Sequence, residues 1–259
     1  MGTAIVTGAG GRLGRAMAVA LGARGYSVAV HYSSSAAGAD ETVTMIEAAG
    51  GTAAPFHADL LDDAQTEGLF GKVKDWVDAD VTCLINNASI FEYDTIRTAT
   101  RTSWDRHIQS NLRAPFILTQ QMAAQNLEPE QDDNGEPRAT GLIVNMIDQR
   151  VRKLTPEFTT YTLAKMGLWA LTQTAAQGLA PAIRVNAIGP GPTLQGARQS
   201  LDHFKTQRAS TVLERGADPQ DIVSALKYFL DATAVTGQLI CVDGGQHLGW
   251  QTPDVLGIE

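Results

Sequence analysis

The sequence has few residues of the kinds that bind metals or form disulfides. It contains two cysteines and five histidines among 259 residues, and their spacing matches no metal site. Cys83 and Cys241 each lie in an apolar run typical of a strand, so we expect buried, inert thiols and no disulfide framework. We therefore expect a protein without a bound metal.

Long hydrophobic runs and an excess of basic residues are also missing. No apolar run is long enough to span a bilayer, and the first predicted strand begins almost at Met1, which leaves no room for a cleavable signal. Aspartate and glutamate number 28 against 20 lysines and arginines, a formal net charge of −8. This balance argues against a nucleic-acid or anionic-membrane surface. We expect a cytoplasmic protein that binds neither nucleic acid nor membrane.

The sequence does contain a regular alternation of short apolar runs and longer helical stretches. The predicted strands are Thr3–Thr7, Ser27–Tyr32, Thr52–His57, Val81–Asn86, Gly141–Ile147, Ile183–Ala187 and Gln238–Val242. The predicted helices are Leu13–Arg24, Ala37–Ala49, Asp62–Val77, Thr102–Asn126, Phe158–Leu179 and Pro219–Leu230. Such alternation predicts an α/β fold, a Rossmann-type doubly wound, seven-stranded parallel sheet with helices on both faces. The length is compatible with a single domain over residues 1–259.

Three parts of the chain stand outside this regular pattern. The acidic, proline-containing segment Glu128–Thr140 predicts a solvated excursion between a helix and the fifth strand. The region 191–216 lacks a clear period and follows a Gly-Pro-Gly-Pro sequence, so we expect a mobile, helical substrate flap there. His107 falls within a predicted helix, and we expect it at the surface or in a subunit interface.

A glycine-rich turn follows the first predicted strand. Gly8, Gly10, Gly11 and Gly14 lie between that strand and the helix that begins at Leu13. Glycine lets the backbone turn tightly and approach a pyrophosphate, and the helix N-terminus supplies unpaired N–H groups with partial positive charge. The turn therefore predicts a dinucleotide-binding site.

The end of the second strand indicates which dinucleotide. NAD-binding folds usually place an acid there to accept a hydrogen bond from the ribose 2′-hydroxyl. Here the sequence is His31-Tyr32-Ser33-Ser34-Ser35, which has no carboxylate. Hydroxyl donors, with His31 nearby, are suited to a 2′-phosphate, so we expect the cofactor to be NADPH/NADP+.

A tyrosine and a lysine mark a candidate proton-transfer site. Tyr161 and Lys165 are four residues apart and project from one face of a predicted helix. A free tyrosine has a pKa of about 10, and a nearby ammonium favours the phenolate and lowers that pKa. Beside a dinucleotide, this pair predicts a reductase.

Together these residues resemble the short-chain dehydrogenase/reductase family over nearly the whole chain. The resemblance implies an adenine-contacting aspartate at Asp59, followed by Leu60, and a proton-relay asparagine at Asn111. The family's glycine-rich turn corresponds to Thr7–Gly14, which includes Gly8, Gly10 and Leu13, and its Asn-Asn-Ala-Gly motif corresponds to Asn86–Ser89, which includes Asn87, Ala88 and Ser89. Further family motifs are Tyr161 with Lys165, Pro190-Gly191 and Val242–Gly245.

Two departures from the family pattern narrow the resemblance. The usual catalytic serine, thirteen residues before the tyrosine, is Asp148, and the usual second glycine of the turn is Arg12. With Phe91 after Asn87-Ala88-Ser89 and with His31-Tyr32, these departures are similar to the pteridine reductases. That resemblance implies an aspartate that works with the tyrosine and lysine, an arginine near the phosphates and the pterin, and a phenylalanine stacked on the pterin ring. The implied substrate site is Arg12, Ser89, Phe91, Asp148 and Tyr161, with Asp148, Tyr161, Lys165 and Asn111 catalytic.

We therefore expect an NADPH-dependent reductase that converts a 7,8-dihydropterin to its tetrahydro form, with oxidised pterin or dihydrofolate as further substrates. The alternatives are a carbonyl reductase of the same family acting on a 3-oxoacyl or other ketone, and a non-catalytic dinucleotide sensor. The sequence leaves the direction of the Asp148 pKa shift open, because burial raises the pKa while Lys165 and an oxidised nicotinamide lower it. Family resemblance also implies a homotetramer built on the 102–126 and 158–179 helices.

Overall fold

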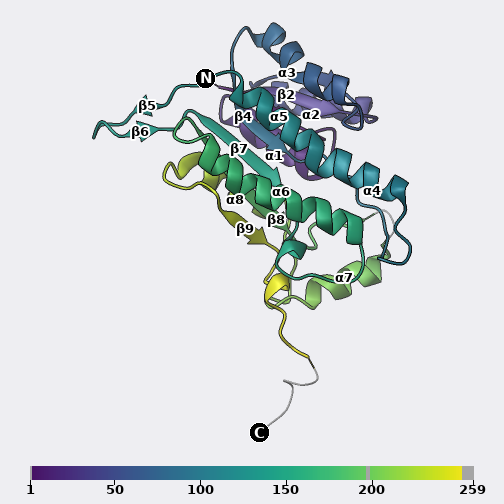
Figure 1. Cartoon of the computed structure of the whole chain (residues 1–259). Coiled ribbons are helices and arrows are strands. Elements are labelled where there is room, and N and C mark those ends of the chain that lie inside the picture. Colours follow the sequence, from purple (N-terminus) through teal and green to yellow (C-terminus); the bar gives the residue numbers. More distant parts are fainter. Residues whose placement is uncertain (1, 197–198, 253–259) are drawn as a thin grey trace.

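Seven parallel strands form one sheet in the order β3-β2-β1-β4-β7-β8-β9 (Figure 1). The computed structural model describes residues 2–196 and 199–252. The strands are β1 (Thr3–Val6), β2 (Ser27–Tyr32), β3 (Thr52–His57), β4 (Val81–Asn86), β7 (Gly141–Met146), β8 (Ile183–Pro190) and β9 (Leu239–Val242). Every neighbouring pair in this sheet is parallel.

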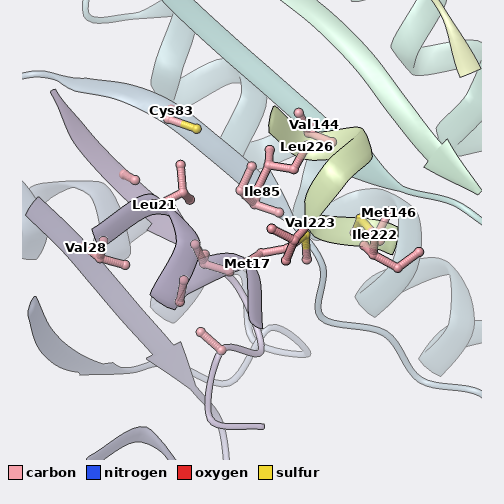
Figure 2. Packing of buried hydrophobic residues seen from close by; sticks show 14 of the residues in the cluster. Met17, Leu21, Val28, Cys83, Ile85, Val144, Met146, Ile222, Val223 and Leu226 are labelled. Carbon is pink, nitrogen blue, oxygen red and sulfur yellow. The ribbon is translucent and has the colours of Figure 1, made fainter. Parts of the chain in front are cut away.

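Helices cover both faces of the sheet. One face carries α1 (Arg12–Ala23), α2 (Ala36–Ala48) and α8 (Pro219–Asp231), and the other carries α3 (Asp63–Val77), α5 (Ala114–Ala123) and α6 (Thr159–Gly178). Figure 2 shows the first layer, in which Met17 and Leu21 of α1 and Leu226 of α8 pack with Ile85 of β4 and Val144 of β7. Each such side chain, when fully buried, contributes about 1.5–3 kcal/mol. The predicted Rossmann-type fold is confirmed.

The structure differs from the predicted elements in one place and adds detail to two others. The single helix expected over 102–126 is α4 (Arg101–Ile108), a π-helical turn η1 (Gln109–Arg113) and α5. The acidic excursion contains a short, exposed antiparallel hairpin of β5 (Glu130–Gln131) and β6 (Pro137–Arg138), which projects from the body of the protein (Figure 1). The region predicted as a flap contains α7 (Leu201–Ala209), and its residues 197–198 lie outside the described part of the chain.

The sheet order creates a crevice at the carboxyl ends of two central strands. The chain runs from β1 outward through β2 and β3, and then returns to the other side of β1 as β4. The loops that leave β1 and β4 consequently diverge toward opposite faces, which is where doubly wound sheets bind their ligands. These loops hold the glycine-rich turn and Asn87–Phe91.

Two further observations concern residues 2–196 and 199–252 as a whole. None of the helices in this part has both the length and the apolar character needed to cross a bilayer, and it contains no group of three or more metal-ligating side chains. Cys83 is buried and Cys241 is half-buried, and both are free thiols.

Candidate active site

A cleft of about 680 Å³ opens at the carboxyl ends of the strands. The predicted site residues on its wall are Gly8, Gly10, Arg12, Leu13, Tyr32, Ser33, Asn87, Ala88, Ser89, Phe91, Asp148, Tyr161, Lys165, Pro190 and Gly191. Gly11, Gly14, Ser34, Ser35, Met146 and Ile147 complete the wall. Met146 and Ile147 escaped the sequence analysis because apolar residues at the end of a strand look like ordinary core.

The glycine-rich turn has the shape that a pyrophosphate requires. Gly8 adopts a left-handed φ of 63°, and a Cβ on Gly14 would lie 2.3 Å from the Gly8 carbonyl oxygen, so neither position tolerates a side chain. Helix α1 begins after Gly11 without a side-chain cap, which leaves its first N–H groups available to an anion. These features fit a dinucleotide.

Arg12 connects the turn to the segment predicted as a flap. Its guanidinium donates to the carbonyl oxygens of Gln195 at 3.0 Å and Leu194 at 3.2 Å. Its backbone has a left-handed φ of 52°, a conformation that costs a residue with a side chain about 1 kcal/mol. The side chain therefore makes two hydrogen bonds from a backbone geometry that glycine would adopt more easily.

His31 lies beneath the turn and not at its mouth. The imidazole is 1% exposed, its Nδ1 accepts from the Gly8 N–H at 3.0 Å, and its Nε2 donates to the Ala58 carbonyl oxygen at 3.0 Å. Burial lowers the pKa of His31 to about 4, so the ring is neutral at pH 7. This position contradicts our expectation of a contact between His31 and a 2′-phosphate, because the ring is uncharged and both nitrogens are engaged within the protein.

Asp59 and Leu60 follow β3 beside the serine-rich end of β2, but they are absent from the wall of the cleft. Leu60 is buried, and the Asp59 carboxylate accepts a hydrogen bond from the Leu61 N–H at 3.0 Å. Their contact with an adenine stays a prediction.

Tyr161, Asp148 and Lys165 meet at the inner end of the cleft. Tyr161 Oη donates to Asp148 Oδ2 at 3.0 Å, and Lys165 Nζ donates to the Met146 carbonyl oxygen at 2.7 Å. The Lys165 ammonium lies 5.7 Å from the centre of the Tyr161 ring. Asp148 follows β7, and its other oxygen accepts from the Arg150 N–H at 2.8 Å. The structure thus brings Asp148, which lies just after β7, close to Tyr161 and Lys165 of α6. The sequence indicated this proximity only through their spacing.

The acid–base properties of this group follow from burial. Burial raises the pKa of Asp148, and burial together with the Asp148 carboxylate raises the pKa of Tyr161 well above its ordinary value. Burial also lowers the pKa of Lys165 to about 8. The expectation that Lys165 lowers the pKa of Tyr161 is therefore wrong for this geometry, since Asp148 is the nearer charge. Tyr161 keeps its proton at neutral pH.

Asn111 lies in the π-helical turn, behind the wall of the cleft. Its side-chain amide makes a pair of 2.8 Å hydrogen bonds with the backbone N–H and carbonyl oxygen of Ile90. A π-helical turn inside a helix often marks a functional position. Asn111 thus anchors the loop that carries Phe91, and its proton-relay role stays a prediction.

Phe91 belongs to an aromatic cluster at the outer end of the cleft. Its ring stacks on Phe158 at 4.3 Å between centroids and meets Tyr161 edge-on at 4.7 Å. The Arg150 guanidinium lies 5.1 Å from the centre of the Phe158 ring. Phe158 was missed by the sequence analysis, because a phenylalanine at the start of an apolar helix gives no signal of its own.

The chain is similar to known proteins over almost its whole length. The sequence profile of the family described as enoyl-(acyl carrier protein) reductase matches residues 8–247. FolM alternative dihydrofolate reductase 1 from Brucella suis, whose crystal structure contains NADP, is 39% identical, with a TM-score of 0.89 and coverage of 98% of both chains. A 3-oxoacyl-[acyl-carrier-protein] reductase from Staphylococcus epidermidis is 30% identical over 251 residues, which cover 95% of this chain and 99% of that protein. The angucycline C-6 ketoreductase LanV, with bound NADP, is 30% identical, with a TM-score of 0.85 and coverage of 96% of both chains.

Proposed function

The chain belongs to the short-chain dehydrogenase/reductase family, and from this premise we propose that it is an NADPH-dependent reductase that transfers hydride to a pterin C=N bond. The product is the tetrahydropterin formed from a 7,8-dihydropterin, and oxidised pterin and dihydrofolate are further candidate substrates. The cofactor is NADP(H), which the related FolM and LanV structures contain.

The hydrogen bond between Tyr161 and Asp148 is the observation that carries this proposal. Reduction of a C=N bond requires a proton at nitrogen as hydride reaches carbon. A half-buried aspartate with a raised pKa can take up and pass on a proton, whereas a serine in its place only orients a carbonyl oxygen. The similarity to a dihydrofolate reductase supports the same substrate class.

The cofactor would be held by residues whose geometry fits it. Gly8, Gly10 and the start of α1 suit the pyrophosphate, the serines after β2 suit a 2′-phosphate, and Lys165 suits the nicotinamide ribose. The bound nicotinamide supplies the hydride.

The chain's own residues then supply the proton and orient the substrate. Tyr161 donates its proton to the substrate nitrogen, and Asp148, which accepts the Tyr161 hydrogen bond, then takes up a proton from solvent and returns it to Tyr161. Phe91 offers a flat apolar face to the pterin ring, and Arg12 offers donors to its polar edge. Hydride and proton together account for the two electrons and two protons of a dihydropterin reduction.

A carbonyl reductase is the second candidate, and two of the relatives named above favour it. The 3-oxoacyl-[acyl-carrier-protein] reductase and the angucycline C-6 ketoreductase are each 30% identical to this chain. Both names denote reduction of a ketone. In that reaction Tyr161 would protonate the carbonyl oxygen, and Asp148 would have no distinct task.

Isotope transfer tests the proposed reaction. NADPH that carries deuterium at the transferable C4 position should yield tetrahydropterin labelled at C6 when 7,8-dihydrobiopterin is the substrate, because C6 is the carbon of the C=N bond. Mass spectrometry of the product detects the label. Absence of tetrahydropterin, with label transferred to the carbinol carbon of a 3-oxoacyl ester, would support the ketone reductase instead.

We also propose that the protein is a homotetramer, as its family resemblance implies. Trp104, Phe116, Leu163 and Met166 are exposed apolar side chains on α4, α5 and α6, the helices expected to form the interface. Light scattering of the wild type and of Leu163→Glu tests this assembly, with dissociation of the variant as the expected result.

A further inference from the structure

We propose that Asp94, Thr160 and His107 form a positioning chain that holds Tyr161 and Phe91 in their working arrangement. The three residues come from the loop after β4, the first turn of α6 and the last turn of α4. This inference rests on the proposed role of Tyr161 as proton donor, and it does not depend on whether the substrate is a pterin or a ketone.

A continuous series of hydrogen bonds joins these residues. The Glu92 N–H donates to His107 Nε2 at 3.1 Å, and His107 Nδ1 donates to Thr160 Oγ1 at 2.6 Å. The Thr160 hydroxyl donates in turn to the Asp94 carboxylate, whose other oxygen accepts from the Thr160 N–H at 3.1 Å. The two ends of the series are the sequence neighbours of the active-site residues, since Glu92 follows Phe91 and Thr160 precedes Tyr161.

All three side chains are shielded from solvent. Asp94 and Thr160 are each 2% exposed, and His107 is fully buried, which contradicts our expectation of a surface or interface position for it. Burial acts to raise the pKa of Asp94, but the hydrogen bonds from Thr160 and Ser103 and the charge of His107 together outweigh it and hold the pKa below its ordinary value. A buried carboxylate and a buried imidazole are retained only with partners, so their alignment fixes the segments that supply those partners.

The backbone around Asp94 reinforces the connection. The Phe158 N–H donates to the Asp94 carbonyl oxygen at 2.7 Å, and Thr95 pairs with Glu157 in an isolated antiparallel bridge. Phe158 has a left-handed φ of 57°, so the chain enters α6 through a conformation that its surroundings must maintain. The loop that carries Phe91 is thereby fastened to the start of the helix that carries Tyr161.

This arrangement defines the aromatic geometry of the cleft. Phe91 stacks on Phe158 and touches Tyr161 edge-on, and the His107 ring lies 6.0 Å from the Tyr161 ring on the buried side. None of the three positioning residues lines the cleft. They are positioning residues, which act through Tyr161 and Phe91, and their loss should affect proton transfer and substrate placement more than cofactor binding.

The chain offers a matched set of variants that flank Tyr161. Thr160→Val removes the hydroxyl at nearly constant volume, and Thr160→Ser retains it. Thr162→Val is the control, because the Thr162 hydroxyl is also buried but has no hydrogen-bond partner in the described part of the chain. Each variant is assayed with the wild type on whichever of 7,8-dihydrobiopterin and a 3-oxoacyl ester the wild type reduces.

We expect Thr160→Val to lower kcat by on the order of tenfold or more, since small displacements of catalytic groups carry large rate penalties. Its KM for NADPH should remain at the wild-type value, Thr160→Ser should restore most of kcat, and Thr162→Val should resemble the wild type. If Thr160→Val fails to fold by circular dichroism, His107→Asn takes its place, because it removes the acceptor for the Glu92 N–H and predicts the same separation of kcat from KM.

Several results would overturn the positioning role. A kcat for Thr160→Val within about twofold of the wild type would do so, as would an equal fall in Thr162→Val or a loss of NADPH affinity that matches the loss of kcat. A wild type that reduces only the oxoester would refute the pterin proposal and leave this test intact.

Discussion

The Tyr161 hydroxyl donates a 3.0 Å hydrogen bond to the Asp148 carboxylate at the inner end of the cleft, where Tyr161 is buried and Asp148 is half-buried. The carboxylate raises the pKa of Tyr161, because two adjacent negative charges are unfavourable, whereas the hydrogen bond from Tyr161 lowers the pKa of Asp148 against the larger effect of burial, which raises it. The pair therefore keeps the Tyr161 proton at neutral pH and places a carboxyl group that can exchange protons beside it. This property distinguishes the site from one in which serine occupies position 148.

Replacement of the aspartate tests this property directly. Asp148→Ser should reduce kcat on dihydropterin on the order of a hundredfold, the usual scale of a general acid–base contribution. Asp148→Asn is the matched control, since it keeps the shape and an acceptor for Tyr161 but cannot carry the proton, and it should be equally impaired. Steady-state kinetics with NADPH measures both, and unchanged turnover in Asp148→Ser would remove Asp148 from the mechanism.

Arg12 combines backbone strain with a useful side chain. Arg12→Ala loses the contacts to Leu194 and Gln195 but keeps the left-handed backbone, whereas Arg12→Gly loses the same contacts and relieves the strain. We expect the glycine variant to be more stable than the alanine variant by about 1 kcal/mol in denaturant unfolding. Both should show a raised KM for the pterin. Equal or reversed stabilities would contradict the strain.

Stability should fall in mild acid because of His31. Its pKa is about 4 in the folded protein, below the ordinary value of 6.5, so the unfolded state binds the proton more readily. The contribution of neutral His31 to stability is fully present above about pH 6.5 and is lost as pH falls toward 4. The free energy of unfolding should fall by about 3 kcal/mol over this range, at 1.36 kcal/mol per pKa unit. Burial of His107 acts in the same direction. Urea unfolding across this range should show a flatter pH dependence for His31→Gln, and an unchanged slope would contradict the assignment.

Activity should fall in mild alkali because of Lys165. Its pKa is about 8, so the ammonium is lost above that pH. We expect kcat/KM for NADPH to decline through this range, because the uncharged amine interacts more weakly with the cofactor. Lys165→Met should be strongly impaired and should lack this decline. A wild-type profile that stays level well above pH 8 would show that Lys165 keeps its proton in the working enzyme.

Much of the fold was accessible from the sequence because its signals are local. Alternating apolar runs and helical stretches mark each β-α unit, and the turn from Gly8 to Gly14 marks the crevice. The division of the 102–126 helix could not be predicted, because the apolar pattern around Asn111 fits a π-helical turn as well as an α-helix.

The buried polar contacts required the structure itself. Thr160 and Asp94 are 66 positions apart, and no periodicity in the sequence predicts that they are in contact. His31 and His107 illustrate the same limit, since a histidine in a strand or helix gives no indication of whether its ring nitrogens find partners inside. Tyr161 and Asp148 were predictable because their spacing belongs to a family pattern.

Oxidation of NADPH by the purified protein, measured in parallel with 7,8-dihydrobiopterin, 7,8-dihydromonapterin, dihydrofolate and a 3-oxoacyl ester, tests the proposed function most directly. The proposal predicts turnover on the pterins and little on the ester, with the rates ranking the pterin side chains. Turnover on the ester alone would contradict it and make the protein a carbonyl reductase in which Asp148, Arg12 and Phe91 have other tasks.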